Sequence, residues 1–533
     1  METETKKTPF YSQKLDDKYT LLNKSIGIDT QTKKLSTRTI KSSCLESGIL
    51  NGQQLLFSFT VSPSAYLDWN NCNMEIGFVF RESATDDRPV KEVSIPWNLL
   101  LNIFEEIIIK FNGTVVYNKV AGEYLETQTF KLLTEYNNKN LNASEIVFSP
   151  IGDYNYNTGL KYGYGFTNTD ISSDDPNAKI RFQNWISDFT TSNGCIRYKR
   201  PNFKDLFFSI PGFSKNLRNV NIDIKLKENI PLAKITNKGL GVMIITSMKL
   251  QLHEYNFSPS SAISSLNSKI NGEDEHISYI DVNKQDREYN NYLSITNQEN
   301  IQWIAVTQFC NYVTSIVAAQ AVDGAINSGV TQYQNCGQFL LFNGYGSNSL
   351  AAKEGDNADD LKVGDVGAQH VIHRSDLPPT TNIEHPTLGN FCHSPISSIQ
   401  AQYGNKMYPS NAIETRIYGG SITYANDNNK KIDYYLLKTD DLYSEYKKAV
   451  GFKNPAVPED IFKRTMPFFL VRFTPNLKLV QSGDIIIRMP GFKGITEGAK
   501  TNTGNKKVSI IYGQLKSFNI SPSGIVDEII KSY

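Results

Sequence analysis

Four of the six histidines lie close together in the second half of the chain, and they are the residues best suited to bind a metal ion. His370, His373, His385 and His393 share one segment with Cys392. Imidazole and thiolate groups are the ligands that zinc prefers in proteins. Their spacing matches no familiar zinc motif, so we predict a long loop with no bound metal and no cofactor, and keep these five residues as the candidate ligands. A pH-sensitive contact is the alternative, because histidine titrates near neutral pH.

The rest of the chain contains no recognisable catalytic motif. The segment GFKGITEGAKT (491–501) resembles a phosphate loop, but Ala499 stands where the lysine would be needed. The acidic run at 356–360 lacks the spaced carboxylates of a calcium loop. Adjacent carboxylates such as Glu105 and Glu106 would point to opposite faces of a strand, and neither GxSxG nor HExxH occurs. The sequence therefore predicts a protein that is not an enzyme.

Size and charge narrow the class of protein further. A chain of 533 residues is too long for one hydrophobic core, so two domains are expected. The net charge of +1 argues against a protein that neutralises nucleic acid along its length, and no sequence-specific nucleic acid binding is expected. The six cysteines are scattered without a CxxC pair, which indicates free thiols. No secretory signal and no transmembrane segment are expected, because no long apolar run occurs.

Most of the chain reads as short strands. Residues 53–61 and 73–81 are apolar runs of strand length, and residues 107–117 predict a hairpin with Asn112-Gly113 at its turn. Apolar residues at helical spacing predict only three short helices, at 96–104, 123–136 and 440–450. Strands do not alternate with helices, so an antiparallel all-β fold is favoured over a parallel α/β sheet.

An internal repeat indicates how these strands are organised. Residues 220–261 align without a gap on residues 483–524, and strand phase is kept because Ile222 and Ile224 fall on Ile485 and Ile487. Chance similarity between two β-rich segments is the alternative. The residues that are identical in the two copies are, in the numbering of the first, Ile222, Ile224, Gly241, Gln251, Leu252, Asn256, Ser258, Pro259 and Ser260.

The repeat is as long as a domain, so we predict two tandem eight-stranded antiparallel jelly-roll sandwiches with a few short helices in the connections. The expected divisions are an N-terminal arm (1–44), a first jelly roll (45–262), a linker (263–290), a second jelly roll with a long loop insertion (291–524) and a C-terminal tail (525–533).

Three segments resemble a known family. IPWNLLLNIFEEIIIKFNGTVVYN (95–118) with the following VAGEYLETQTFKLLTEYNNKNLNAS (120–144), DLFFSIPGFSKNLRNVNIDIKL (205–226), and HPTLGNFCHSPISSIQAQYGNKMYP (385–409) resemble, in the same order, segments of the double jelly-roll major capsid proteins of virophages, Polinton-like viruses and adintoviruses. The chain departs from the family where VAGEY replaces YPYRAY, and residues 310–385 fit no pattern of the family.

The resemblance implies a major capsid protein of a double-stranded DNA virus. Such a chain would form a homotrimeric, pseudo-hexameric capsomer that tiles an icosahedral shell. Its partners would be itself, neighbouring capsomers, and penton and minor capsid proteins. It would be made in the host cytoplasm and reside in the virion, with the segments 1–40 and 525–533 facing the interior. The alternatives are a viral minor capsid or spike protein and, because aromatic residues are abundant, a carbohydrate-binding or carbohydrate-cleaving β-sandwich protein.

Overall fold

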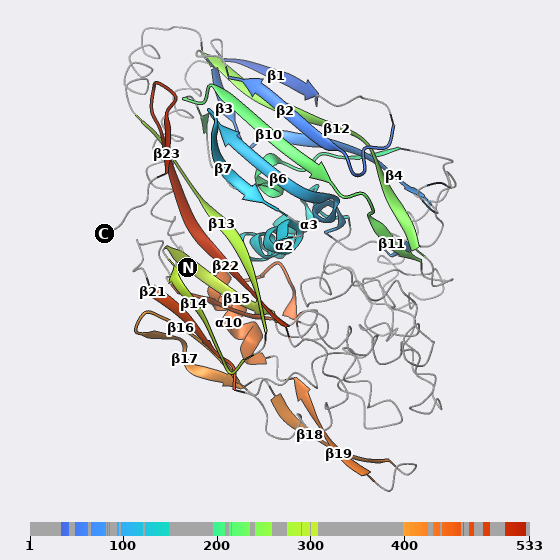
Figure 1. Cartoon of the computed structure of the whole chain (residues 1–533), viewed down its shortest axis with the longest axis vertical. Coiled ribbons are helices and arrows are strands. Elements are labelled where there is room, and N and C mark those ends of the chain that lie inside the picture. The colour runs from blue at the N-terminus through green and yellow to red at the C-terminus, as the bar shows by residue number, and fades with distance from the viewer. Residues whose placement is uncertain are drawn as a thin grey trace, which may run out of the picture.

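The computed structural model describes residues 33–41, 48–148, 196–257, 274–307, 398–473, 483–490 and 507–528, with short gaps inside these ranges. These residues form two β-sandwiches that follow one another along the chain (Figure 1).

The first sandwich has two facing antiparallel sheets. The neighbouring strands of one sheet are, in spatial order, β1 (Lys33–Lys41), β12 (Leu240–Phe257), β4 (Asn73–Arg81) and β8 (Arg197–Lys199). The neighbouring strands of the other are β2 (Gln54–Thr60), β10 (Asn219–Leu226), β6 (Phe104–Phe111) and β7 (Thr114–Lys119). Short strands extend the first sheet, namely β3 (Ala65–Asp68), β5 (Val93–Ser94), β9 (Phe213–Ser214) and β11 (Pro231–Lys234).

The second sandwich is built in the same way. One sheet consists of β13 (Glu275–Glu288), β22 (Lys507–Ile520), β15 (Ile301–Thr307) and β20 (Phe469–Arg472), with β23 (Val526–Glu528) also paired to β22. The facing sheet consists of β14 (Tyr292–Gln298), β21 (Gly483–Arg488), β16 (Ser398–Tyr403) and β17 (Lys406–Glu414). A further hairpin, β18 (Arg416–Tyr424) with β19 (Lys430–Leu437), forms a separate two-stranded sheet.

Strand order identifies both sandwiches as jelly rolls. Each sandwich has eight main strands, which are the four neighbouring strands named above for each of its two sheets. Counted along the chain, the first pairs with the eighth, the eighth with the third, and the third with the sixth. In the facing sheet the second pairs with the seventh, the seventh with the fourth, and the fourth with the fifth. The order is the same in both sandwiches, so the predicted all-β fold of two tandem jelly rolls is confirmed.

The repeat found in the sequence falls on equivalent strands of the two rolls. It covers β10 to β12 in the first roll and β21 to β22 in the second, which are the seventh and eighth strands. Ile222 and Ile224 are fully buried, as are Ile485 and Ile487. Alternate residues of these strands therefore fill the core of each sandwich in the same phase, as the alignment required.

Several local predictions are also confirmed. Helix α2 (Glu123–Glu135) and helix α10 (Asp440–Val450) lie where helical spacing predicted them. At the predicted hairpin turn both Asn112 (φ 48°) and Gly113 (φ 92°) have the positive φ that a type I′ turn requires. The segment predicted as a helix at 96–104 is instead a single 3-10 turn, η1 (Leu99–Ile103), because strand β6 begins at Phe104. The short helices α3 (Asn138–Asn142) and α5 (Phe203–Leu206) were not predicted.

Three strands lie in segments for which the sequence predicted no core strand. Strand β1 lies in the expected arm, β13 in the expected linker, and β23 in the expected tail. Each of them pairs with a single neighbour, so each is an edge strand. Edge strands are typically polar, and a search for apolar runs therefore misses them. Strand β1 of the first roll begins at Lys33, and strand β13 of the second roll begins at Glu275.

Candidate functional site

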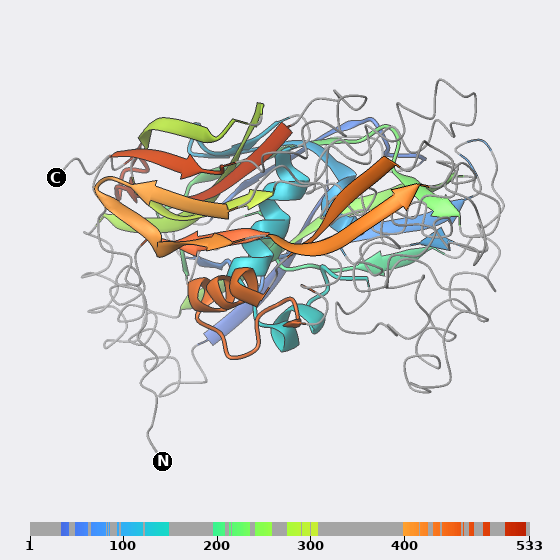
Figure 2. The ribbon, with the colours of Figure 1, turned by 90° about the horizontal axis from the view of Figure 1, so that it is seen from below.

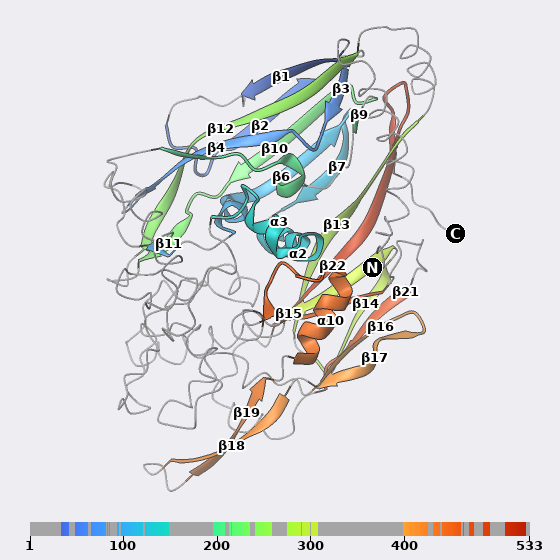
Figure 3. The same cartoon turned by 180° about the vertical axis from the view of Figure 1, so that it is seen from behind.

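The feature that sets this chain apart from a single jelly roll is the junction between its two rolls, and helix α2 lies at its centre (Figure 3). Nearly every residue of α2 is buried, which requires contacts on all sides of the helix. The helix packs against β6 and η1 of the first roll and against β13, β22 and α10 of the second. Viewed from below, it runs through the middle of the molecule (Figure 2).

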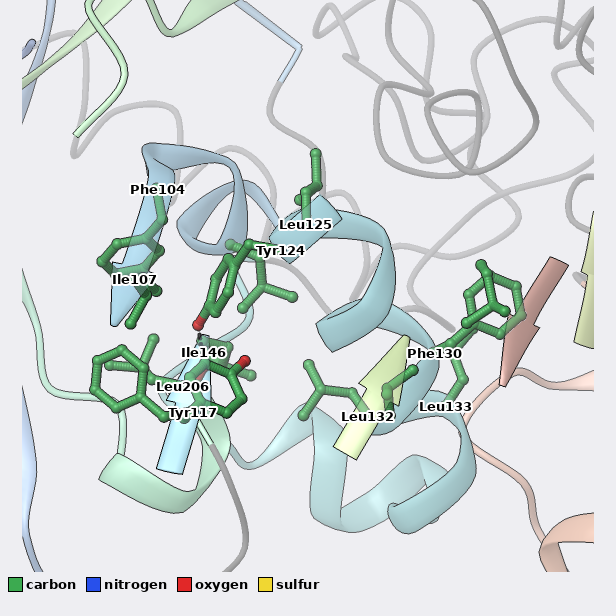
Figure 4. Packing of buried hydrophobic residues seen from close by; sticks show 14 of the residues in the cluster. Phe104, Ile107, Tyr117, Tyr124, Leu125, Phe130, Leu132, Leu133, Ile146 and Leu206 are labelled. Atoms are coloured by element: carbon green, nitrogen blue, oxygen red, sulfur yellow. Dashed lines mark hydrogen bonds between the residues drawn. The ribbon is translucent and has the colours of Figure 1, made fainter. Parts of the chain in front are cut away.

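The two ends of α2 pack against different rolls. Tyr124, near its start, meets Phe104 of the first roll edge to face, with ring centroids 5.0 Å apart (Figure 4). Phe130, farther along, meets Phe468 of the second roll at 5.1 Å. The Tyr446 hydroxyl of α10 donates a hydrogen bond to the Leu133 carbonyl of α2 at 2.8 Å. Helix α2 is therefore part of both hydrophobic cores.

Buried charges cross the same junction. The Lys119 Nζ at the end of β7 lies 2.9 Å from an Asp281 carboxylate oxygen of β13, and their side chains are only 1% and 5% exposed. Lys516 of β22 binds the other oxygen of the same carboxylate at 2.9 Å. Lys119 also donates a hydrogen bond to the Asn283 side-chain carbonyl at 2.8 Å.

The two lysines determine the charge of the carboxylate. Burial alone would raise the pKa of Asp281, but the ammonium groups of Lys119 and Lys516 outweigh burial and lower this pKa below its usual value. Asp281 is therefore ionised at neutral pH. The cluster combines a cation from the first roll with an anion from the second.

A second buried ion pair joins α2 to β13. Glu126 and Lys284 lie 2.6 Å apart with side chains 3% and 10% exposed, and Asp286 lies 3.2 Å from the same ammonium group. Burial would lower the pKa of Lys284, but the two carboxylates reverse the shift and raise it. Removing one partner of such a pair leaves a buried charge uncompensated and costs about 3–5 kcal/mol.

Backbone carbonyls at the end of β22 are held by the first roll. The Asn112 amide donates to the Gly524 carbonyl at 2.7 Å, and the Asn216 amide donates to the Ile520 carbonyl at 2.8 Å. The Asn112 side-chain carbonyl accepts from the backbone N–H groups of Arg218 and Asn219, each at 2.8 Å. The turn residue Asn112 thus ties the first roll to the end of the second.

A separate polar cluster is buried within the first roll. The Lys131 ammonium donates to the carbonyls of Lys204 at 2.8 Å and Phe207 at 3.1 Å. Nearby, the carboxylate of Asp205 accepts from the hydroxyls of Tyr136 and Ser144. Burial raises the pKa of Asp205 to about 7. This cluster lies between α2 and α5.

The candidate metal ligands of the sequence lie elsewhere. His370, His373, His385, Cys392 and His393 fall outside the described residues, so their arrangement stays a prediction. Within the described part of the chain, no group of three or more potential metal-ligating side chains comes together. Among the described helices, none has the length and apolar character needed to span a bilayer. Sequence reasoning missed the charged junction, because its partners come from distant segments.

Comparisons with known proteins concern the fold. No protein-family model and no curated protein matches the sequence. Among solved structures, the chain is similar to one from the Sputnik virophage (TM-score 0.43, 9% identity, covering 94% of this chain and 89% of that chain). It is also similar to the mavirus major capsid protein (0.40, 12%, 95% and 92%) and to the Faustovirus major capsid protein (0.38, 7%, 91% and 90%). These identities and TM-scores are low, so the fold assignment rests on strand order, which shows that the chain is a tandem double jelly-roll protein.

Proposed function

We propose that this chain is the major capsid protein of a double-stranded DNA virus. The observation that carries the proposal is the pair of jelly rolls with identical strand order, joined by one buried junction. The three sequence segments that resemble major capsid proteins support the same function. An enzyme would need a catalytic constellation, and the sequence motifs supply none.

We infer that three copies assemble into one capsomer. Three chains with two similar lobes each give six lobes around a threefold axis, so the trimer has a nearly hexagonal outline and can tile an icosahedral shell. The buried contacts of α2 fix the distance between the two lobes of one chain. A fixed distance is what regular tiling requires, because neighbouring capsomers must meet the same surface at every lobe.

The remaining parts of the proposal concern partners and location. The chain would bind further copies of itself within and between capsomers, and penton and minor capsid proteins at special positions of the shell. It would be made in the host cytoplasm and reside in the virion. The net charge of +1 leaves neutralisation of the genome to other molecules.

Native mass spectrometry of the purified protein tests this assembly. The expected species is a trimer of three 60.0 kDa chains that persists on dilution to micromolar concentration. Obligate interfaces of this kind bury about 2,000 Å² or more, which makes dissociation slow. A stable monomer at that concentration would contradict the proposal.

The number of copies in the virion separates a shell protein from a spike protein, since a major capsid protein dominates a gel of purified particles. A glycan array separates both from a carbohydrate-binding sandwich.

A further inference from the structure

The buried cluster at the junction brings together three groups that can react with one another. The Lys119 Nζ, a potential nucleophile, lies 2.8 Å from the side-chain carbonyl oxygen of Asn283. The same nitrogen lies 2.9 Å from the Asp281 carboxylate, which can accept a proton. Asn283 and Asp281 are two residues apart on β13, and Lys119 comes from β7 of the other roll.

We propose that Lys119 and Asn283 form an isopeptide bond that joins the two jelly rolls covalently. The Lys119 Nζ becomes bonded to the Asn283 Cγ, and the amide nitrogen of Asn283 leaves as ammonia. This proposal is independent of the capsid function, because it concerns bonds within one chain. It is a self-modification that occurs once, with no external substrate.

The reaction balances without an oxidant or a co-reactant. Asp281 first accepts a proton from the Lys119 ammonium group, which frees the lone pair of Nζ. Nζ attacks Cγ of Asn283, and the carbonyl π electrons move to the oxygen. When the carbonyl re-forms, the C–N bond of the former amide breaks, and the leaving nitrogen takes a proton from the attacking nitrogen. Asp281 then gives its proton to the departing ammonia, so that a carboxylate and an ammonium ion remain.

The surroundings favour this reaction over a plain ion pair in two respects. The Lys119 side chain is 1% exposed, so its amine is shielded from bulk water. The strands hold the groups within hydrogen-bond distance, and such fixed proximity replaces a bimolecular encounter. The Tyr117 ring lies 5.7 Å from the Lys119 Nζ, and the Tyr279 hydroxyl donates to the Val116 carbonyl beside them.

Lys516 opposes the first step. Its ammonium group binds the second oxygen of Asp281 at 2.9 Å and makes the carboxylate a weaker base. Lys516 is 31% exposed, so replacing it leaves no deeply buried gap. Removing this cation makes proton transfer from Lys119 easier and speeds formation of the bond. A purely structural cluster has no such dependence, since it has no bond to form.

Mass spectrometry of the intact, denatured full-length chain, followed by peptide mapping, tests the proposal. The expected result is a mass lower by one ammonia together with a cross-linked peptide that contains both Lys119 and Asn283. The peptide decides, because a succinimide at Asn112-Gly113 would lose the same ammonia without a cross-link. The Lys119→Met variant is expected to keep its full mass and to give two separate peptides. Lys516→Met is expected to form the cross-link faster than the unmodified sequence.

Peptide mapping of the unmodified protein tests the proposed bond even if a variant fails to fold. Folded protein that gives separate Lys119 and Asn283 peptides after prolonged incubation would overturn the proposal. A cross-link that forms more slowly in Lys516→Met would overturn the role assigned to Asp281 as proton acceptor.

Discussion

Replacing Glu126 by glutamine tests whether the buried ion pair holds the two rolls together. Glutamine keeps the size of the side chain but removes the charge that compensates Lys284 at 2.6 Å. Loss of one partner of a buried pair costs about 3–5 kcal/mol, and Asp286 at 3.2 Å offsets part of this loss. We therefore expect the free energy of unfolding to fall by about 3 kcal/mol, measured by urea denaturation at one fixed protein concentration.

The chain offers a matched control for this substitution. Glu445 and Lys448 form an ion pair at 2.5 Å on the surface of α10, where the lysine side chain is 68% exposed. Glu445→Gln is expected to cost at most about 0.5 kcal/mol, because exposed helical pairs contribute little. The reasoning is refuted if Glu126→Gln costs no more than Glu445→Gln. In a double-mutant cycle, adding Lys284→Met to Glu126→Gln is expected to restore part of the lost stability, since it removes the orphaned charge.

Three further substitutions have defined outcomes. Because burial raises the pKa of Asp205 from 3.8 in the unfolded chain to about 7, its contribution to stability is greatest below about pH 4 and is lost as the pH rises to about 7. Asp205→Asn removes this titration. The stability of the variant relative to the unmodified chain should therefore rise by up to about 4 kcal/mol between about pH 4 and pH 7. Parallel pH profiles of thermal unfolding for the two proteins would contradict this expectation. Asn112→Ala removes the hydrogen bond to the Gly524 carbonyl and places a side chain that resists positive φ in the turn. It should therefore lower the free energy of unfolding more than Asn112→Gly, which removes only the hydrogen bonds. Equal free energies of unfolding for the two variants would contradict the role of the turn. Gly513→Ala would push a methyl group into the Trp303 ring and should cost about 1–3 kcal/mol, visible as a lower midpoint of denaturation; an unchanged midpoint would show that the ring moves freely.

The sequence predicted the elements whose signal is local. Alternation of apolar residues, the Asn112-Gly113 turn and the spacing of α2 and α10 each depend on neighbours along the chain. The repeat predicted that the seventh and eighth strands of the two rolls are equivalent, without any knowledge of which strands pair. Two tandem jelly rolls could therefore be predicted from the sequence alone.

The junction could not be predicted in the same way. Lys119 ends strand β7, and Asp281 lies inside strand β13. Nothing in the residues between them indicates that the two side chains meet. Sequence patterns even favoured the opposite view for β13, because its polar residues resemble a linker. Two of those polar residues, Asp281 and Lys284, bind charged partners of the first roll, so their polarity reflects an interface and not exposure to solvent.

The connection between the fifth and sixth strands carries a helix in each roll, and the two helices meet. Helix α2 lies in the connection between the fifth and sixth strands of the first roll, and α10 lies in the same connection of the second. The two helices meet through the Tyr446 hydroxyl and the Leu133 carbonyl. Helices at one equivalent position in each roll thus supply part of the contact between the rolls.

Electron microscopy of the purified protein tests the central claim most directly. Two equivalent jelly rolls per chain, held at a fixed distance by α2, predict trimeric particles with threefold symmetry and six lobes in a nearly hexagonal outline. Particles with two lobes only, or trimers in which the two rolls of each chain take variable positions, would contradict the account.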